Sequence, residues 1–407
     1  MVPGAPGHPR AATEQTSRDN RLAASVTDAQ HPRVLLVHNR YRTVGGEERS
    51  VALQAAAFEH AGVPHALMER RSSDAGRARV ATAMLRGGDS TSHVTRAVQA
   101  LGADVVHAHN MLPLIGPKGL VAARDAGAKV VLHLHNVRLF CATGFGEREG
   151  GPCTRCRGRN TLPGLRLNCR GSRSEAAIYA AALAAHQPAV LAAVDRFVTP
   201  SVAAAEQVIE RGLPADKVEA LGHYLPAEAF AAGSRADVGQ YVLVASRLSQ
   251  EKGVGDAIAA ADAVGAPLRI VGDGPEAGRL RERAAAARVP VELLGRVEPA
   301  RVRELLAGAA AVLMPSRYHE FSPYSALEAM AQGVPVVATA MGGLPDLLGP
   351  GRCVPMGDMD AFAARLASLW ADPRTRQVEG TELLERARAR HSEGPYLDAL
   401  MDLYARL

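Results

Sequence analysis

The chain has 407 residues, of which 47% are hydrophobic and 22% charged. This is enough apolar material for two or three domains with their own cores, and it excludes collagen and wholesale disorder. A net charge of +5 without a run of five basic residues argues against a nucleic-acid-binding protein. Residues 1–31 lack the apolar centre of a signal peptide and are expected to be a disordered tail.

The first half of the chain alternates short apolar runs with helical patterns, which predicts a parallel sheet covered on both faces. Strands are predicted at 34–38, 104–109, 129–135 and 196–200, and helices at 50–61, 91–101, 119–126 and 176–194. The last helix is mostly Ala and is interrupted by Pro188. Because no run of 18 strongly apolar residues occurs, we expect no membrane span, although peripheral membrane contact stays open.

The second half repeats this pattern more regularly. Strands are predicted at 241–245, 268–271, 291–294, 311–315 and 334–338, and helices at 254–264, 275–287, 300–307 and 323–331. Three further helical segments follow residue 359. We therefore expect two doubly wound, Rossmann-like α/β domains at 32–230 and 240–385, joined through 227–239 and followed by a C-terminal helix at 386–407. Ligands of such domains bind at the carboxyl ends of the strands, so the two domains should face each other across a cleft.

The segment with the most candidate functional residues is EFSPYSALE at 320–328, which follows a predicted strand directly. Pro323 suits the first position of a helix, so Glu320 would lie in the loop and Glu328 two turns into the helix, both in reach of one ligand. Backbone amides that open a helix suit a phosphate, here those of Phe321, Ser322 and Tyr324. The alternative is structural: Glu328 pairs with a buried Arg, and Glu320 caps the helix.

A second candidate is RLSQEKG at 247–253, just past a predicted strand. Arg247 and Lys252 could clamp a diphosphate, or they could simply be a solvated helix start. Gly45 and Gly46 lie between a strand and a helix, where glycine allows close approach to a ligand. Gly272 begins a further glycine-containing loop, but its spacing departs from a dinucleotide-binding fingerprint.

Histidines and cysteines form two further groups. His107 and His109 close one predicted strand, and His133 and His135 lie on another; with no carboxylate nearby and the pairs on separate strands, we expect no metal there. Cys141, Cys153, Cys156 and Cys169 lie in an insertion at 138–173 that is poor in apolar residues. They could hold a structural zinc ion or be four reduced thiols packed together. Five cysteines, an odd number, suit the reducing cytoplasm.

The ordered set of these motifs resembles the retaining glycosyltransferases of family 4, over about 33–348. The cysteine-bearing segment is similar to that of a bacterial subgroup of the family. The resemblance implies a GT-B fold, a nucleoside diphosphate sugar as donor, with UDP-sugars as the family's usual choice, and no metal or other cofactor. It also implies an acceptor that is a small molecule, a lipid-linked compound or a glycan.

The resemblance also assigns roles to residues of this chain. Glu328 would bind the ribose hydroxyls, and Arg247 and Lys252 would neutralise the diphosphate. Glu320 would bind hydroxyls of the transferred sugar, with His109 near the sugar and the acceptor. Further donor contacts would come from Gly45, Gly46, Gly272, Phe321 and Ser322. The competing interpretations are a non-catalytic nucleotide or sugar binder on this fold, a nicotinamide-dependent oxidoreductase, and a pyridoxal-containing phosphorylase.

Overall fold

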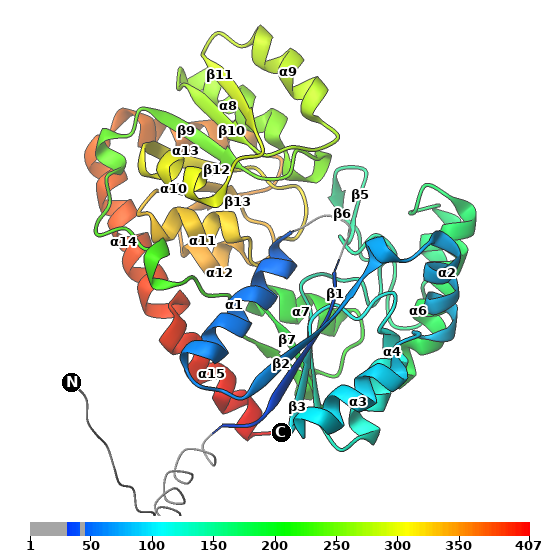
Figure 1. The fold of residues 1–407 in the computed structure, drawn as a ribbon. Helices are drawn as coiled ribbons and strands as arrows, with labels where there is room; N and C mark the ends of the chain where they lie inside the picture. Colours follow the sequence, from blue (N-terminus) through cyan, green and yellow to red (C-terminus); the bar gives the residue numbers. More distant parts are fainter. Residues whose placement is uncertain (1–30, 41–44) are drawn as a thin grey trace, which may run out of the picture.

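The computed structural model describes residues 31–40 and 45–407, and it contains two parallel six-stranded sheets in two facing domains (Figure 1). The expected pair of doubly wound α/β domains is confirmed. Apart from His31, the tail expected at 1–31 lies outside the described residues.

The N-terminal sheet has the strand order β2-β1-β3-β4-β7-β8, with every pair parallel. Its strands are β1 (Val34–Arg40), β2 (His65–Arg71), β3 (Val105–Ala108), β4 (Lys129–His133), β7 (Arg196–Thr199) and β8 (Val218–Ala220). Its helices are α1 (Gly46–His60), α2 (Arg77–Arg86), α3 (Thr91–Leu101), α4 (Gly116–Asp125), α6 (Arg173–Ala193) and α7 (Val202–Glu210). The insertion adds a two-residue hairpin, β5 (Glu147–Arg148) and β6 (Gly151–Pro152), and the short helix α5 (Leu162–Arg166).

The C-terminal sheet has the order β11-β10-β9-β12-β13-β14, again parallel throughout. Its strands are β9 (Tyr241–Ala245), β10 (Leu268–Val271), β11 (Val291–Gly295), β12 (Ala309–Met314), β13 (Val336–Thr339) and β14 (Cys353–Val354). Its helices are α8 (Val254–Val264), α9 (Ala277–Ala286), α10 (Pro299–Ala307), α11 (Tyr324–Ala331), α12 (Leu344–Leu348), α13 (Met359–Ala371) and α14 (Pro373–His391). Buried Val, Leu, Ile and Ala side chains fill both faces of this sheet, as covered parallel strands require.

The chain returns to the N-terminal domain at its end. Helix α14 packs on α11 of the C-terminal domain, and α15 (Glu393–Ala405) follows it after Ser392. Four side chains of α15, those of Tyr396, Leu400, Leu403 and Tyr404, join the core beneath β1 and α1. Figure 1 shows this last helix, in red, beside α1. Residue 386, where a separate C-terminal helix was expected to start, lies within α14.

Helix α6 is the one described helix that is long and apolar enough to cross a membrane by length and composition, with a mean hydropathy of 1.4. Its Leu183, Val190 and Ala193 are buried in the N-terminal core. Apart from Arg173 at its start, the side chains it leaves exposed are small, including Ala181 and Ala185. The helix therefore supplies one covering layer of the sheet, and Pro188 lies inside it without ending it.

Candidate functional site

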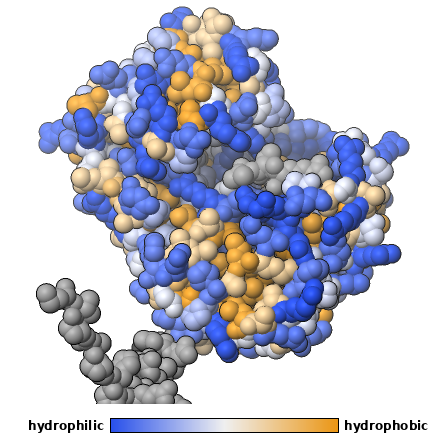
Figure 2. Space-filling model, viewed as in Figure 1, coloured by the Kyte–Doolittle hydropathy of each residue, from blue (hydrophilic) through white to orange (hydrophobic). Residues whose placement is uncertain are grey.

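The candidate site lies where the carboxyl ends of the two sheets face each other. In each sheet the strand order reverses beside the first strand, between β1 and β3 and between β9 and β12, which is where doubly wound sheets bind ligands. Figure 2 shows the molecule hollowed between the two domains on this face. The loops after β9 and β12 bring the charged groups of the C-terminal domain to this edge.

Lys252 and Glu320 form an ion pair at the carboxyl ends of β9 and β12, with 2.7 Å between Nζ and Oε1. Ser316 donates a hydrogen bond to the same carboxylate oxygen, and Tyr318 donates one to Oε2, each at 2.7 Å. Lys252 also donates to the Tyr318 hydroxyl at 3.0 Å. The carboxylate thus accepts three hydrogen bonds, and the ammonium keeps one of its three N–H groups for a ligand.

This arrangement keeps the lysine charged. Burial alone would lower the pKa of Lys252, but the Glu320 carboxylate and the Tyr318 hydroxyl outweigh it and hold that pKa above its ordinary value. Burial raises the pKa of Tyr318, so its hydroxyl stays a neutral donor. The Lys252 side chain is 16% exposed and that of Glu320 only 4%. The group that can meet an anion here is the ammonium.

Arg247 lies on the loop after β9 and is held from both domains. Its Nη2 pairs with Glu251, and its Nε donates to the Ser249 hydroxyl at 3.1 Å. The guanidinium carbon lies 4.9 Å from the centre of the Phe145 ring, which belongs to the insertion of the N-terminal domain. Phe145 also meets Tyr318 edge-on, with 6.3 Å between ring centroids. The insertion therefore reaches the cationic groups of the other domain.

Helix α11 begins one residue later than predicted. Pro323 is its N-cap with an extended backbone, and Tyr324 is the first helical residue. The prediction that Pro323 opens the helix is wrong by this one position. Phe321 contacts the other domain, because its carbonyl accepts a hydrogen bond from Ser201 at the start of α7. Ser322 is buried beside it.

Glu328 lies two turns into α11, as expected, and is paired across the domains. Its Oε1 lies 2.6 Å from Nη1 of Arg49 on α1. The Arg49 guanidinium also lies over the ring of Tyr324, with 4.6 Å to the centroid. The structural alternative considered for Glu328, a pair with an Arg, is thus present in the structure, although both side chains keep some exposure.

Gly45 and Gly46 belong to the start of α1, because Gly45 is the N-cap and the helix starts at Gly46. The predicted start at Ser50 is wrong because Glu48 satisfies the Gly45 amide, with 2.8 Å between Gly45 N and Oε2, and stabilises an earlier first turn. A Cβ at Gly46 would lie 3.4 Å from the Tyr324 ring. The start of α1 therefore lies against α11 of the other domain at about van der Waals distance from Tyr324.

Gly272, at the end of β10, has a backbone that requires glycine. Its φ is +133°, and a Cβ there would lie 1.8 Å from the carbonyl oxygen of Ser246. The loop after β10 is thus pressed against the loop after β9 that carries Arg247. Gly272 shapes the site through this packing.

His109 is buried, and both of its ring nitrogens have partners. Nε2 lies 2.8 Å from the Gln54 side-chain oxygen, and Nδ1 lies 2.9 Å from Nε2 of His135. With the Gln54 amide in this orientation, His109 carries its proton on Nε2 and accepts from His135 through Nδ1. The histidine that could contact a substrate is therefore His135, which is more exposed than His109.

A parallel set of contacts leads to His133. The Tyr404 hydroxyl lies 2.6 Å from Nδ1 of His107, and Nε2 of His107 lies 3.3 Å from Nδ1 of His133. The other nitrogen of His133 is buried without a hydrogen-bond partner among the described residues. Ring stacking continues from His133 through His135 and His223 to Tyr324 on α11. A column of imidazoles in the N-terminal domain thus ends against the Tyr324 ring of the other domain.

The histidines are close enough to form two metal-binding triads, in which the ring nitrogens lie within 4.8 Å of one another: His107, His109 and His133, and His133, His135 and His223. The two histidine pairs do lie on separate strands, as expected, but β3 and β4 are neighbours, so the imidazoles come together. Burial lowers the pKa of each of these rings, so the column is neutral. The expectation of a metal-free site stays a prediction; hydrogen bonds occupy both ring nitrogens of His107 and His109, whereas Nε2 of His133 has no partner among the described residues.

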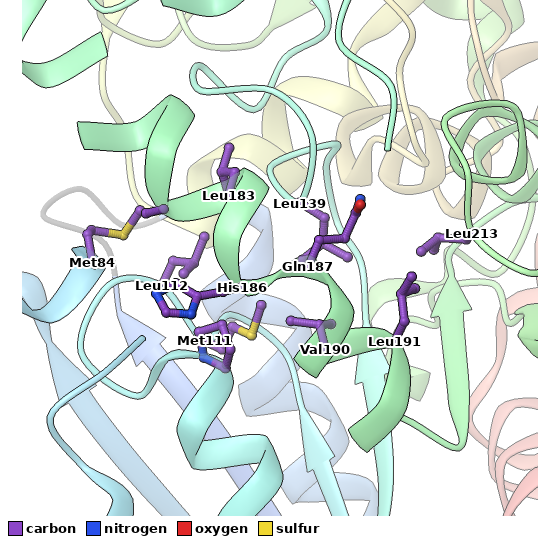
Figure 3. Close-up of a pocket in the computed structure, with 12 residues that line it drawn as sticks. Met84, Met111, Leu112, Leu139, Leu183, His186, Gln187, Val190, Leu191 and Leu213 are labelled. Carbon is purple, nitrogen blue, oxygen red and sulfur yellow. The ribbon is translucent and has the colours of Figure 1, made fainter. Parts of the chain in front are cut away.

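An apolar cavity lies elsewhere in the N-terminal domain, with a volume of about 20 Å³. Figure 3 shows that Met84, Met111, Leu183 and Val190 line it, together with the polar tips of His186 and Gln187. None of the candidate donor-binding residues lines this cavity. Its lining lacks a charged side chain, so it does not suit a diphosphate.

Sequence patterns missed several residues of the site. Arg49, Phe145, Ser316 and Tyr318 were not singled out, because each is brought to the cations only by tertiary packing. Tyr318 lies two residues before Glu320, which is the one local signal that pointed to it. Arg49 and Glu328 are 279 residues apart, so no local pattern could pair them.

Comparison with known proteins identifies what both halves are similar to. The profile described as "Glycosyl transferase 4-like domain" matches residues 17–222, and that described as "Glycosyl transferases group 1" matches residues 239–372. The 2-deoxystreptamine N-acetyl-D-glucosaminyltransferase of Streptomyces fradiae is 37% identical over 128 residues, which are 28% of this chain and 30% of that protein. A Mycobacterium tuberculosis glycogen synthase is 35% identical over 147 residues, 33% of this chain and 35% of that protein. The chain thus spans about a third of the length of these curated relatives.

Solved structures support the fold. The structure of Anabaena HepE in complex with UDP has a TM-score of 0.66 at 18% identity and covers 92% of this chain and 100% of its own. Sucrose-phosphate synthase from Thermosynechococcus elongatus has a TM-score of 0.67 at 17% identity, covering 92% and 99%. The expected GT-B arrangement is therefore confirmed.

Proposed function

Because the chain belongs to the group 1 glycosyltransferases and has a family 4-like N-terminal domain, we propose that it transfers a hexosyl group from a UDP-sugar to an acceptor with retention of the anomeric configuration. HepE has been solved with UDP and with UDP-glucose, which supports uridine as the nucleoside. The five cysteines are free thiols, which suits a reaction in the cytoplasm.

The observation that carries this proposal is the fixed ammonium of Lys252. Glu320 and Tyr318 hold it where the strand order of the C-terminal sheet reverses, and keep it charged. When the bond between sugar and diphosphate breaks, negative charge builds up on the leaving diphosphate. A preorganised cation stabilises that charge more in the transition state than in the ground state. The Arg247 guanidinium would add to this on the same loop.

Glu320 acts mainly by positioning Lys252. Its two oxygens already accept three hydrogen bonds, and its side chain is almost fully buried. Such a carboxylate is a poor nucleophile, so a covalent glycosyl-enzyme intermediate through Glu320 is disfavoured. Retention would then follow from attack of the acceptor on the same face as the departing diphosphate, whose oxygen takes the acceptor proton.

Glu328 would bind the ribose hydroxyls of the donor. It lies on α11, whose first turn faces the N-terminal domain and contacts Gly46 through Tyr324. For a ribose to use Glu328, Arg49 must share the carboxylate or turn away from it. An Arg released in this way would be next to the donor diphosphate, where its charge is useful.

The acceptor would enter from the N-terminal side of the hollow, between the insertion and the exposed edge of His135. The acceptor would belong to one of the three classes named from the sequence: a small molecule, a lipid-linked compound or a glycan. The neutral imidazole of His135 would accept or pass on a proton there, because its Nε2 proton already goes to His109.

The proposal is tested by a donor screen of the purified chain against UDP-, GDP- and ADP-sugars, in which slow hydrolysis of the donor replaces the unknown acceptor. We expect hydrolysis of a UDP-sugar and calorimetric binding of UDP. Lys252→Met should slow the hydrolysis by about 10²- to 10³-fold and leave UDP binding measurable. If no donor is hydrolysed and no nucleoside diphosphate binds, the proposal is wrong.

A further inference from the structure

The insertion places four thiols that the donor chemistry does not use around one cavity. Cys141, Cys153, Cys156 and Cys169 all line one cavity of about 20 Å³ between β5, α5 and the loop after β4. A cavity of this size holds about one water-sized particle. All four side chains are partly buried, and none is in a disulfide.

We propose that these four cysteines bind one structural zinc ion, which fixes the insertion against the donor side of the hollow. The spacing includes a C-x₂-C pair at Cys153 and Cys156, as in structural zinc sites, and four cysteine sulfurs are the ligand set of a closed tetrahedral site. In the described residues the groups already within 4.8 Å are histidine triads, so a zinc ion would draw the four sulfurs closer together. One Zn²⁺ ion would bind the four thiols after each loses its proton to solvent. The resulting tetrathiolate complex carries two net negative charges, and four protons are released. No oxidant is required.

The positive charge of arginine side chains around the cavity favours an occupant with net negative charge. Arg211 lines it and is 2% exposed, yet its guanidinium donates only to carbonyl oxygens, to Gln207 at 2.9 Å and to Cys153 at 3.1 Å. Among residues 31–40 and 45–407, no carboxylate forms an ion pair with it. A buried cation without a counter-ion is costly, and the two negative charges of a zinc tetrathiolate would offset that cost.

A second arginine, Arg148, lines the same cavity. Arg148 donates to the carbonyl of Leu167 at 3.0 Å, and its Nη1 lies 4.0 Å from Sγ of Cys169. Glu147, the carboxylate in the lining, accepts instead from the amide of Gly150 at 2.7 Å. Arg148 also pairs with Glu149 at 3.0 Å, so Arg211 is the cation of this cavity that has no carboxylate partner among the described residues.

The backbone of the insertion also needs a cross-link. Its regular structure is a two-residue hairpin and the five-residue helix α5. In the described residues, the two residues other than glycine with positive φ are both here: Glu149 at 55° and Asn168 at 47°, the latter next to Cys169. Such conformations persist where the surroundings enforce them, and a metal held from four points along the insertion would do so.

The cross-link would have a consequence at the donor site, and this step rests on the proposed function. Phe145 lies between Cys141 and Cys153 along the chain, and its ring faces the Arg247 guanidinium and Tyr318. Fixing the two cysteines would fix this ring. The zinc ion would then hold the surface that covers the diphosphate-binding cations.

Zinc binding is tested on the full chain purified under reducing conditions, by elemental analysis and by the spectrum of the cobalt(II)-substituted protein. We expect one zinc ion per chain and the thiolate-to-metal charge-transfer bands of a tetrahedral four-sulfur site. The double variant Cys153→Ser/Cys156→Ser should lose the zinc and unfold at a lower temperature. The matched control is Cys353→Ser, which removes the thiol outside the cluster and should keep the metal.

Three results would overturn the zinc proposal: protein purified without stoichiometric zinc that also fails to take up zinc or cobalt when it is supplied, full zinc content in the double variant, or disulfides among the four cysteines in protein alkylated before lysis. Because wild-type metal content and the cobalt spectrum need no variant to fold, a misfolded double variant does not rescue the proposal. Metal content is also independent of donor turnover, so failure of the zinc site and failure of the glycosyltransferase proposal are distinguishable.

Discussion

Arg49 and Glu328 join the two domains directly, with 2.6 Å between Nη1 and Oε1, and each comes from the helix that starts at the opposing edge of the site. The pair is partly exposed, so it contributes at most about 1 kcal/mol to stability. Its significance is positional, because it occupies the carboxylate that the family resemblance gives to the donor ribose.

Glu328→Ala is expected to weaken UDP binding by roughly 10- to 100-fold, since hydrogen bonds between ribose hydroxyls and a carboxylate are lost. Arg49→Met is the matched variant, because it removes the same inter-domain pair and leaves the carboxylate. It should change the dissociation constant of UDP much less. Calorimetry measures the dissociation constant of UDP for both variants. If the two substitutions weaken UDP binding equally, Glu328 serves only as the partner of Arg49.

Lys252→Met is expected to lower kcat by about 10²- to 10³-fold, the range seen when one preorganised electrostatic group is removed. The KM for the donor should change far less, because the cation acts on charge that develops during bond breaking. Lys118→Met, at an exposed lysine on α4, is the control. A kcat of Lys252→Met equal to that of the control contradicts the assignment.

Phe145→Ala is expected to raise the donor KM by about two- to fivefold, because the Arg247 guanidinium loses its aromatic contact and its fixed orientation. Phe145→Trp should restore the wild-type value, since the indole ring offers the strongest cation–π face. Steady-state kinetics of the two variants measure this. If Trp and Ala have the same KM, the ring contact plays no part in donor binding.

The histidine column predicts loss of stability in mild acid. Burial lowers the pKa of His107 to about 3, and burial with the charges of His391 and Arg49 lowers that of His223 to about 3. The unfolded chain therefore binds protons that the folded chain does not, so stability is full above pH 6.5 and falls as pH drops toward 3. Each ring should cost about 2 kcal/mol at pH 5.

Urea unfolding between pH 7.5 and 4.5 measures this slope. His107→Gln should flatten it, because one titrating ring is removed. His60→Gln is the matched control, since His60 is largely exposed and pairs with Glu393 on the surface. An equal slope in wild type and His107→Gln would show that the buried rings do not govern acid stability.

Much of the fold follows from local pattern. The predicted strands at 241–245 and 268–271 and the helix at 254–264 have the observed bounds, because continuous apolar runs and a C-terminal glycine define them locally. Edge strands were missed: β2 has a half-exposed, Arg-rich sequence, and β8 and β14 are only two or three residues long. Short or polar edges carry little periodicity, so no window of sequence separates them from loops.

Sequence alone determined the two parallel sheets and the placement of Arg247, Lys252, Glu320 and Glu328 after the strands of the second domain, since apolar periodicity and the carboxyl-end rule are local properties. Only the tertiary structure decided which side chains interact with each of these charged groups. Lys252 depends on a hydroxyl and a carboxylate more than 60 residues away, and Glu328 on an arginine of the other domain. The physical reason is range: strand and helix preferences act over a few residues, whereas ion pairs and stacked rings form wherever folding brings side chains within a few ångströms.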